Sequence, residues 1–292
     1  MYKLKHWVYS ILKNLSENPN AIPLLDKILL DKIQELDIWQ NLSLNPNAID
    51  LLEKNQDKID WNRLSLNPNA IPLLERNQDK ICWSWLSENP NAIHLLEKHQ
   101  RVIDWMYLST NPNAIDLLER NPGKIDWCWL SKNPNAIHLL ERNPDKIDWK
   151  LLSKNPNAIH LLERNPNKIN WSGLSENPNA IPLLEKNQDK IDWYSLSKNP
   201  NAVHLLEKNQ DEIDWCWLSE NPNAIDLLEK NQDKINLLIL FRNPSIFEID
   251  YEALHERCAI YKEELIQIAL HPSRIQKLLD MGISIRELDK CI

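Results

Sequence analysis

Residues 133–154 read Asn-Pro-Asn-Ala-Ile-His-Leu-Leu-Glu-Arg-Asn-Pro-Asp-Lys-Ile-Asp-Trp-Lys-Leu-Leu-Ser-Lys, and most of the chain repeats this unit. From Asn45 onward the Asn-Pro pair recurs every 22 residues, ending in a degraded copy at Asn243. The full copies of Asn-Pro-Asn-Ala begin at Asn18, Asn45, Asn67, Asn89, Asn111, Asn133, Asn155, Asn177, Asn199 and Asn221. A fixed period of this length is the signature of a repeat architecture, in which each unit buries its apolar face against the next.

Positions 1 to 22 of the unit are counted here from the Asn of Asn-Pro. Positions 4, 5, 7 and 8 are apolar in every full copy, which is the spacing of a helix rather than of a strand. Proline occupies position 6 at Pro23, Pro72 and Pro182, and it is tolerated only in the first turn of a helix. The first helix therefore begins near position 4. We expect Asn at position 3 to be its N-cap and Asn at position 11 to be a left-handed C-cap.

The second half of the unit predicts a second helix. Its apolar residues in the quoted copy are Ile147, Trp149 and Leu152. Asp145 is the expected N-cap, with Asp148 as a rival. Helices of about two turns, roughly 12 Å long, do not form alone in water, so they must pack on neighbouring copies. The predicted fold is all-α: an α-solenoid of about ten 22-residue helix-turn-helix repeats with atypical N- and C-terminal caps.

We expect three segments: an N-terminal cap at residues 1–17, the helical repeat solenoid at 18–242 and a C-terminal helical cap at 243–292. The first step, from Asn18 to Asn45, is 27 residues long, and the extra residues are expected to lengthen a helix. A long helix is predicted over 250–270. With helices packed about 8–10 Å apart, ten units give a contour of roughly 90–100 Å, so the particle should be elongated or curved.

Composition excludes several classes of function. The net charge is −8, and acids and bases are mixed along every unit, without a basic tract for nucleic acid. Five cysteines without a Cys-x-x-Cys pair indicate free thiols in a reducing compartment. No apolar run approaches the ~20 residues of a membrane span, and no signal peptide is visible, so we expect a cytoplasmic protein. Because the sequence contains neither a Gly-rich phosphate loop nor a catalytic constellation outside the repeat, we expect no enzyme activity and no cofactor.

Two sets of repeated residues could carry chemistry. Position 6 is histidine at His94, His138, His160 and His204, but neighbours about 10 Å apart are too distant to share one metal ion, so no metal site is predicted. Nine copies carry Trp at position 17. A Trp stripe could stack the bases of single-stranded nucleic acid, but its regularity between an Ile and a Leu favours a place in the core.

Positions 18, 19 and 22 vary most between copies, and they share one face of the second helix. Trp and Tyr are enriched at binding hot spots, so this face is the predicted protein-binding surface. Its aromatic residues are Trp85, Tyr107, Trp129, Tyr194 and Trp217. Local packing of Trp85, Trp129 and Trp217 against Met106 or the cysteines is the competing interpretation. The predicted function is a non-enzymatic scaffold or adaptor. The alternatives are a single-stranded nucleic-acid reader and a structural component of a virus particle.

The pattern Asn-Pro-Asn-Ala-Ile-x-Leu-Leu-Glu-Lys-Asn followed by Lys-Ile-Asp-Trp resembles the short helical repeats in protein families of giant DNA viruses. The ending around residues 263–274 is also similar to the tail of such proteins. The resemblance covers nearly the whole chain. It implies a viral repeat protein made in the cytoplasm of an infected host cell, and it implies no particular activity.

Overall fold

The computed structural model describes residues 13–27 and 36–247, and every regular element in these residues is helical. The chain divides into two compact units, Met1–Ile246 and Phe247–Ile292. The first unit holds all the helices that the structure describes. The helix predicted over 250–270, most of the expected N-terminal cap and most of the insertion before Asn45 lie outside the described residues.

Each repeat consists of a short α-helix, a 3-10 turn and a second short α-helix, which confirms the predicted α-solenoid. The first helices are α2 (Ile22–Lys27), α4 (Ile49–Lys54), α6 (Ile71–Glu75), α8 (Ile93–Lys98), α10 (Ile115–Glu119), α12 (Ile137–Arg142), α14 (Ile159–Arg164), α16 (Ile181–Glu185), α18 (Val203–Lys208) and α20 (Ile225–Glu229). The second helices are α3 (Leu36–Leu44), α5 (Trp61–Leu66), α7 (Trp83–Glu88), α9 (Trp105–Thr110), α11 (Trp127–Leu130), α13 (Trp149–Ser153), α15 (Trp171–Glu176), α17 (Trp193–Leu196), α19 (Trp215–Glu220) and α21 (Leu237–Leu240). The 3-10 turns between them include η6 (Gln100–Val102) and η8 (Pro144–Lys146).

The caps of the first helix differ from those predicted. Asn133, at position 1, accepts the backbone N–H of Asn135 at 3.0 Å, whereas Asn135 donates its side-chain amide to the Pro112 carbonyl of the preceding unit at 2.9 Å. Position 3 therefore joins units instead of capping the helix. Asn143 at position 11 has φ −132° and ψ 58°, which is not left-handed, and its amide closes the helix by donating to the Leu139 carbonyl at 2.9 Å.

The second helix starts at position 17 and is capped by the rival residue at position 16. Asp148 accepts the backbone N–H of Leu151 at 2.9 Å, while Asp145 lies in the preceding 3-10 turn. Ile147 between them is extended, with φ −70° and ψ 125°, so the turn and the helix cannot merge. The second helix is consequently shorter than the sequence pattern predicts.

The core is made of small and branched apolar residues rather than of the Trp stripe. Ala136, Leu140 and Leu152 are fully buried, as are their counterparts in the other full copies except Leu240, which is half-buried. Of the nine position-17 tryptophans only Trp39 is buried, at 2% exposure, and the other eight are half-buried. Six of the nine lie under a lysine from position 14 of the following unit, as in Trp149 with the Lys168 ammonium 4.6 Å from the ring centre. The core assignment was therefore wrong for most of the stripe, whose outer faces form cation–π contacts.

Buried asparagines link consecutive units. The Asn133 amide donates to the carbonyls of Ser109 at 3.0 Å and Asn111 at 2.8 Å, both in earlier units. Ser131 donates to the Trp127 carbonyl at 2.8 Å and accepts the backbone N–H of Asp148, in the following unit, at 3.0 Å. Buried polar groups need hydrogen-bond partners. The Asn and Ser side chains supply them to backbone groups of the turns, which have no partner within a helix. This explains why Asn and Ser recur at positions 1 and 21 in nearly every copy.

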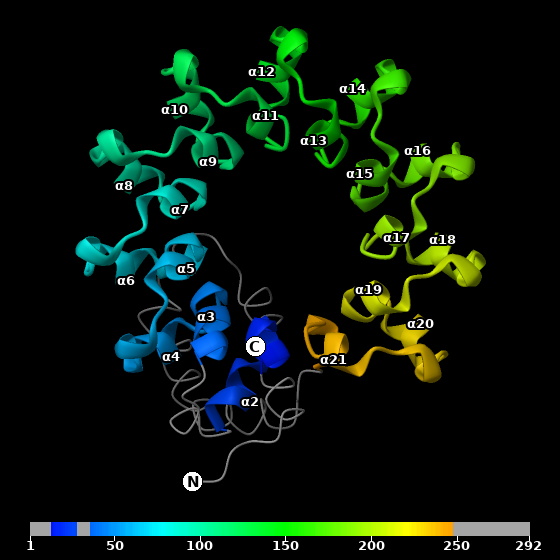
Figure 1. The fold of residues 1–292 in the computed structure, drawn as a ribbon, viewed down its shortest axis with the longest axis horizontal. Helices are drawn as coiled ribbons and strands as arrows, with labels where there is room; N and C mark the ends of the chain where they lie inside the picture. The colour runs from blue at the N-terminus through cyan, green and yellow to red at the C-terminus, as the bar shows by residue number, and fades with distance from the viewer. Residues whose placement is uncertain (1–12, 28–35, 248–292) are drawn as a thin grey trace, which may run out of the picture. The chain divides into compact units, whose positions relative to one another are not determined.

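The asparagine links close into a circle. The Asn18 amide donates to the carbonyls of Phe241 at 3.0 Å and Asn243 at 2.8 Å, the same two acceptor positions that the amide of Asn133 uses. The side-chain amide of each position-1 Asn donates to the backbone carbonyl of the position-1 Asn before it, and Asn18 donates to Asn243. The asparagines in this circle are Asn243, Asn221, Asn199, Asn177, Asn155, Asn133, Asn111, Asn89, Asn67, Asn45 and Asn18. Figure 1 shows the resulting ring, in which the segment around α2 lies near α21. The sequence predicted a curved stack, but it did not predict that the first unit closes on itself.

One position of the ring is assembled from two distant segments. Residues 243–246 supply its Asn-Pro turn, and residues 13–17 supply its second helix. Asn14 donates to the Leu238 carbonyl at 2.7 Å on one side, and Lys13 pairs with Asp37 at 3.0 Å on the other. The incomplete first copy and the degraded last copy therefore complement each other at this seam.

Candidate functional site: the inner face of the ring

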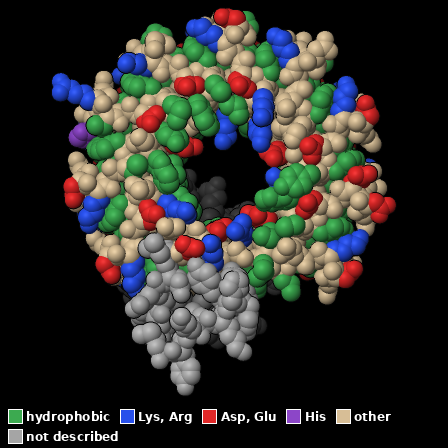
Figure 2. Space-filling view, in the orientation of Figure 1, with side chains coloured by type: hydrophobic (Ala, Val, Ile, Leu, Met, Phe, Trp, Pro, Cys, Tyr) green, Lys and Arg blue, Asp and Glu red, His purple; other side chains and the backbone are tan. Residues whose placement is uncertain are grey.

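The second helices, from α3 to α21, line the central opening, and the first helices lie behind them (Figure 1). On each second helix, Leu at position 20 and Ser at position 21 are buried in most copies. Positions 18, 19 and 22 lie on the opposite side of a helix with 3.6 residues per turn, so they face the opening. Figure 2 shows this opening edged by apolar, basic and acidic side chains. We call this surface the inner face.

The five predicted binding residues all belong to the inner face. Four of them occupy position 19 on α7, α9, α11 and α19, and Tyr194 occupies position 18 on α17. Tyr194 is 52% exposed and the other four are half-buried. The structure divides them into two groups with different surroundings.

The first group, which we call the open arc, consists of Trp85, Tyr107, Trp129, Lys132 and Lys150. The three aromatic residues come from the consecutive helices α7, α9 and α11, which pack on one another in order. Within residues 13–27 and 36–247, none of the three rings contacts another aromatic ring or lies under a cation. Lys132 and Lys150 are exposed, and neither has an ion pair or a side-chain hydrogen bond in the described part of the chain. The open arc thus presents apolar rings beside two uncompensated positive charges.

The second group, the paired arc, consists of Glu176, Tyr194, Lys198 and Trp217. The Lys198 ammonium lies 4.1 Å from the centre of the Trp217 ring and 4.7 Å from that of Tyr194, and the two rings meet edge to face at 6.1 Å. Glu176 pairs with Lys198 at 3.6 Å. Trp217 is therefore packed locally, but against Lys198 and Tyr194 rather than against Met106 or a cysteine.

Gly173 on α15 marks the border between the arcs. Its neighbour Lys154 pairs with Glu176 at 2.6 Å. A Cβ at residue 173 would lie 3.2 Å from Cγ of Lys154, so a larger side chain would press on this lysine. Glycine at this position leaves room for Lys154 to reach Glu176, which is thereby shared between Lys154 and Lys198.

Two cysteines occupy position 18 of the inner face. The Cys128 thiol donates to Asp148 at 3.4 Å, and burial, reinforced by this hydrogen bond and by the negative charge of Asp148, raises the pKa of the thiol. Cys216 instead accepts from the Asn236 amide at 3.5 Å. Because its pKa is raised, the Cys128 thiol stays protonated, and a protonated thiol is a poor nucleophile.

The position-6 histidines lie on the first helices. Each is exposed and pairs with a glutamate of the preceding unit, as His138 does with Glu119 at 3.1 Å and His94 with Glu75 at 3.0 Å. Among the described residues no group of three or more His, Cys, Asp or Glu is placed to hold a metal ion. These histidines therefore tie neighbouring units together.

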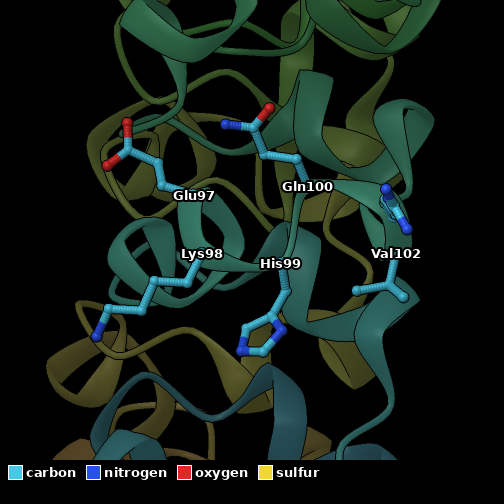
Figure 3. A pocket seen from close by; sticks show the side chains of 6 residues that line it. Glu97, Lys98, His99, Gln100 and Val102 are labelled. Atoms are coloured by element: carbon cyan, nitrogen blue, oxygen red, sulfur yellow. The ribbon is translucent and has the colours of Figure 1, made fainter.

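A hollow of about 360 Å³ lies where α8 meets η6, in the unit where Val102 replaces the position-14 lysine. His99 contacts Trp83 here, with ring centres 4.8 Å apart and the ring planes tilted by 46°. Figure 3 shows that the side chains of Glu97, Lys98 and Gln100 point in different directions. Polar groups that do not converge give a ligand no common point of attachment, so this hollow is a poor candidate site.

Comparison with known proteins gives no relative: no family model matches the chain, and neither a curated protein nor a solved structure is significantly similar to it. Within the described residues, every helix is too short or too polar to cross a membrane.

Proposed function

We propose that the ring is a non-enzymatic scaffold that binds a protein partner through its inner face. The observation that supports the proposal is where the copies differ. Residues that hold the units together recur from copy to copy, whereas positions 18, 19 and 22, on the inner face, vary most between copies. Packing alone would allow small or polar residues at these positions. Their aromatic content favours a recognition surface.

The charge of the inner face favours protein over nucleic acid. Nucleic-acid binding depends on cations that neutralise successive phosphates. Here Lys198 and Lys154 are already paired with Glu176, and Arg242 is paired with Glu17 at 2.9 Å. The viral origin, the host cytoplasm and a place in a virus particle are implied by the resemblance alone, and they remain predictions beside this proposal.

The proposal is tested with two triple variants of the full chain. The inner variant replaces Trp85, Trp129 and Trp217 by Ser. The outer control replaces His94, His138 and His204 by Ser, at exposed positions of the first helices. Tagged proteins are recovered from the native host cells, with and without nuclease, after circular dichroism has confirmed equal helicity. We expect one protein partner that the wild type and the outer control both retain and that the inner variant loses.

Retention of that partner by the folded inner variant would reject the inner face. Loss from the outer control alone would move the binding site to the first helices. Loss of the partner after nuclease treatment of the wild-type sample would favour the nucleic-acid alternative.

A further inference from the structure

We infer that the open arc is the ligand-binding part of the inner face, and that its ligand is an extended peptide with apolar side chains followed by acidic ones. The inference rests on the proposed function, and it adds where the partner binds and by what chemistry. It depends on three features of the inner face: which rings are accessible, which cations lack a counter-charge, and how far apart these groups lie.

The accessible rings are those of the open arc. A ligand that stacks on Trp217 must first displace Lys198, which contacts two rings and Glu176 at the same time. No described cation covers Trp85, Tyr107 or Trp129, so a ligand meets no such competition there. Binding costs less where the protein need not break contacts of its own.

The two lysines without a described ion pair lie at one end of the row of aromatic rings, next to Trp129. Lys132 follows α11, directly after the helix of Trp129, and Lys150 lies on the next inner helix, α13. Lys154 on the same helix is already committed to Glu176. Two exposed ammonium groups without a described counter-charge complement carboxylates on a partner. The positive end therefore specifies acidic residues, and the aromatic end specifies apolar ones.

The spacing fits an extended chain. Neighbouring helices pack about 8–10 Å apart, which matches one turn of an extended polyproline II chain, three residues at ~3.1 Å each, whose every third side chain lies on the same side. Successive position-19 rings would then meet about every third side chain of a peptide that runs from α7 to α13. The expected pattern is three apolar residues at this spacing followed by acidic residues.

Single-stranded nucleic acid fits the same surface less well. A strand that stacks its bases on Trp85, Tyr107 and Trp129 carries a phosphate at each nucleotide. The sequences of α7 and α9 contain no Lys or Arg, and Glu88 ends α7. The phosphates over two of the three rings would therefore find no neutralising partner on these helices.

The test is a selection of random displayed peptides on the full-length wild-type protein, followed by counter-selection on the Lys132→Glu/Lys150→Glu variant. The most enriched peptide is then synthesised with a fluorescent label, and its Kd is measured by polarisation. We expect enrichment of peptides with apolar and acidic halves. The Lys132→Glu/Lys150→Glu variant should weaken binding by about tenfold or more, as expected for reversed charges at an interface. Trp85→Ser/Trp129→Ser should also weaken it.

A matched control separates the open arc from the rest of the ring. Lys186→Glu/Lys208→Glu reverses two exposed lysines at the ends of neighbouring first helices, where no described ion pair is lost, and it should leave the Kd unchanged. Selection of basic peptides, or no enrichment over the counter-selection, would overturn the inference. A labelled oligothymidylate that binds more tightly than the best peptide would also overturn it.

One pattern separates failure of this inference from failure of the proposed function. If Trp85→Ser/Trp129→Ser weakens binding while Lys132→Glu/Lys150→Glu does not, the inner face binds peptides but the acidic chemistry is wrong. If neither pair matters but Trp217→Ser weakens binding, the peptide binds the paired arc, and only this inference fails. If none of the three variants matters, the peptide binds away from these aromatic residues, and both proposals fail.

Discussion

The open arc and the paired arc are built on the same backbone, yet they present opposite surfaces to the central opening. Lys132 and Lys198 occupy the same position of the repeat, and only Lys198 covers aromatic rings. The reason lies in two neighbours. Lys198 has Tyr194 four residues before it and Trp217 on the next inner helix, whereas Lys132 has Cys128 and Leu151 in these places. A surface lysine is thus either engaged or available according to two neighbouring side chains.

We expect equivalent buried residues beneath the two arcs to contribute equally to the free energy of unfolding. Asn133→Ala beneath the open arc and Asn199→Ala beneath the paired arc each leave one carbonyl, that of Ser109 or Ser175, and one backbone N–H without a partner. The second acceptor in each case keeps the backbone N–H of Ala114 or Ala180. At about 1–3 kcal/mol for each unsatisfied group, either variant should lose about 2 kcal/mol or more of unfolding free energy. Urea denaturation followed by circular dichroism checks this. A difference of more than about 1 kcal/mol between the variants would mean that the arcs differ below the surface as well.

The aromatic residues themselves should separate the arcs. Trp217→Ala removes a cation–π contact and an edge-to-face ring contact, and Trp129→Ala removes neither. Trp217→Ala should therefore be the more destabilising by about 1–2 kcal/mol. The same denaturation measurement applies, with helicity compared before the melt. Equal losses would show that Lys198 does not stabilise Trp217 in solution.

Removing Lys198 should convert the paired arc toward an open one. Lys198→Met should cost only about 1 kcal/mol, because the lysine is partly exposed and its pair with Glu176 is screened. Oxidation of Trp217 by N-bromosuccinimide, followed by peptide mass spectrometry, should become faster. The matched control is Lys132→Met, which should leave the oxidation rate of Trp129 as it was. An unchanged rate at Trp217 would argue that Lys198 leaves this ring accessible.

The smallest expected effect concerns the position-18 cysteines. Cys128 in α11 faces Asp148 and its thiol pKa is raised, so it should react slowly with iodoacetamide near pH 8. Cys216 in α19 faces the neutral Asn236 and should react faster. Asp148→Asn should speed alkylation of Cys128 without loss of fold, because Asn170 caps the equivalent helix of the next repeat. Mass spectrometry of timed samples measures both rates, and a slower Cys216 would contradict the argument.

The sequence was sufficient to predict the repeat and the face that varies, because both follow from periodicity. Apolar spacing at positions 4, 5, 7 and 8 predicted the first helix, and proline at position 6 located its start. The caps were harder to predict. Asn at positions 1, 3 and 11 and Asp at positions 13 and 16 are all good capping residues, and only the path of the backbone decides which of them bonds within the helix and which bonds to the next unit.

Two features could not be predicted from a single unit. The exposure of Trp149 depends on Lys168, which lies in the following copy, so a pattern within one copy assigned the ring to the core. Closure depends on the small rotation between neighbouring units summed over all of them, which no local pattern records. The incomplete copies at residues 13–17 and 243–246 are the only trace of closure in the sequence, and each copy taken alone predicts a cap at one end of an open stack.

The closed chain of asparagine links gives the number of repeats a role that it lacks in an open stack. Each of the eleven links must turn the backbone by one eleventh of a full turn on average. Gain or loss of one 22-residue copy would force all the others to change their rotation, or it would pull Asn18 away from Asn243. Closure of the ring therefore constrains the number of copies, and with it the size of the opening. Single substitutions can still change the residues that line the opening.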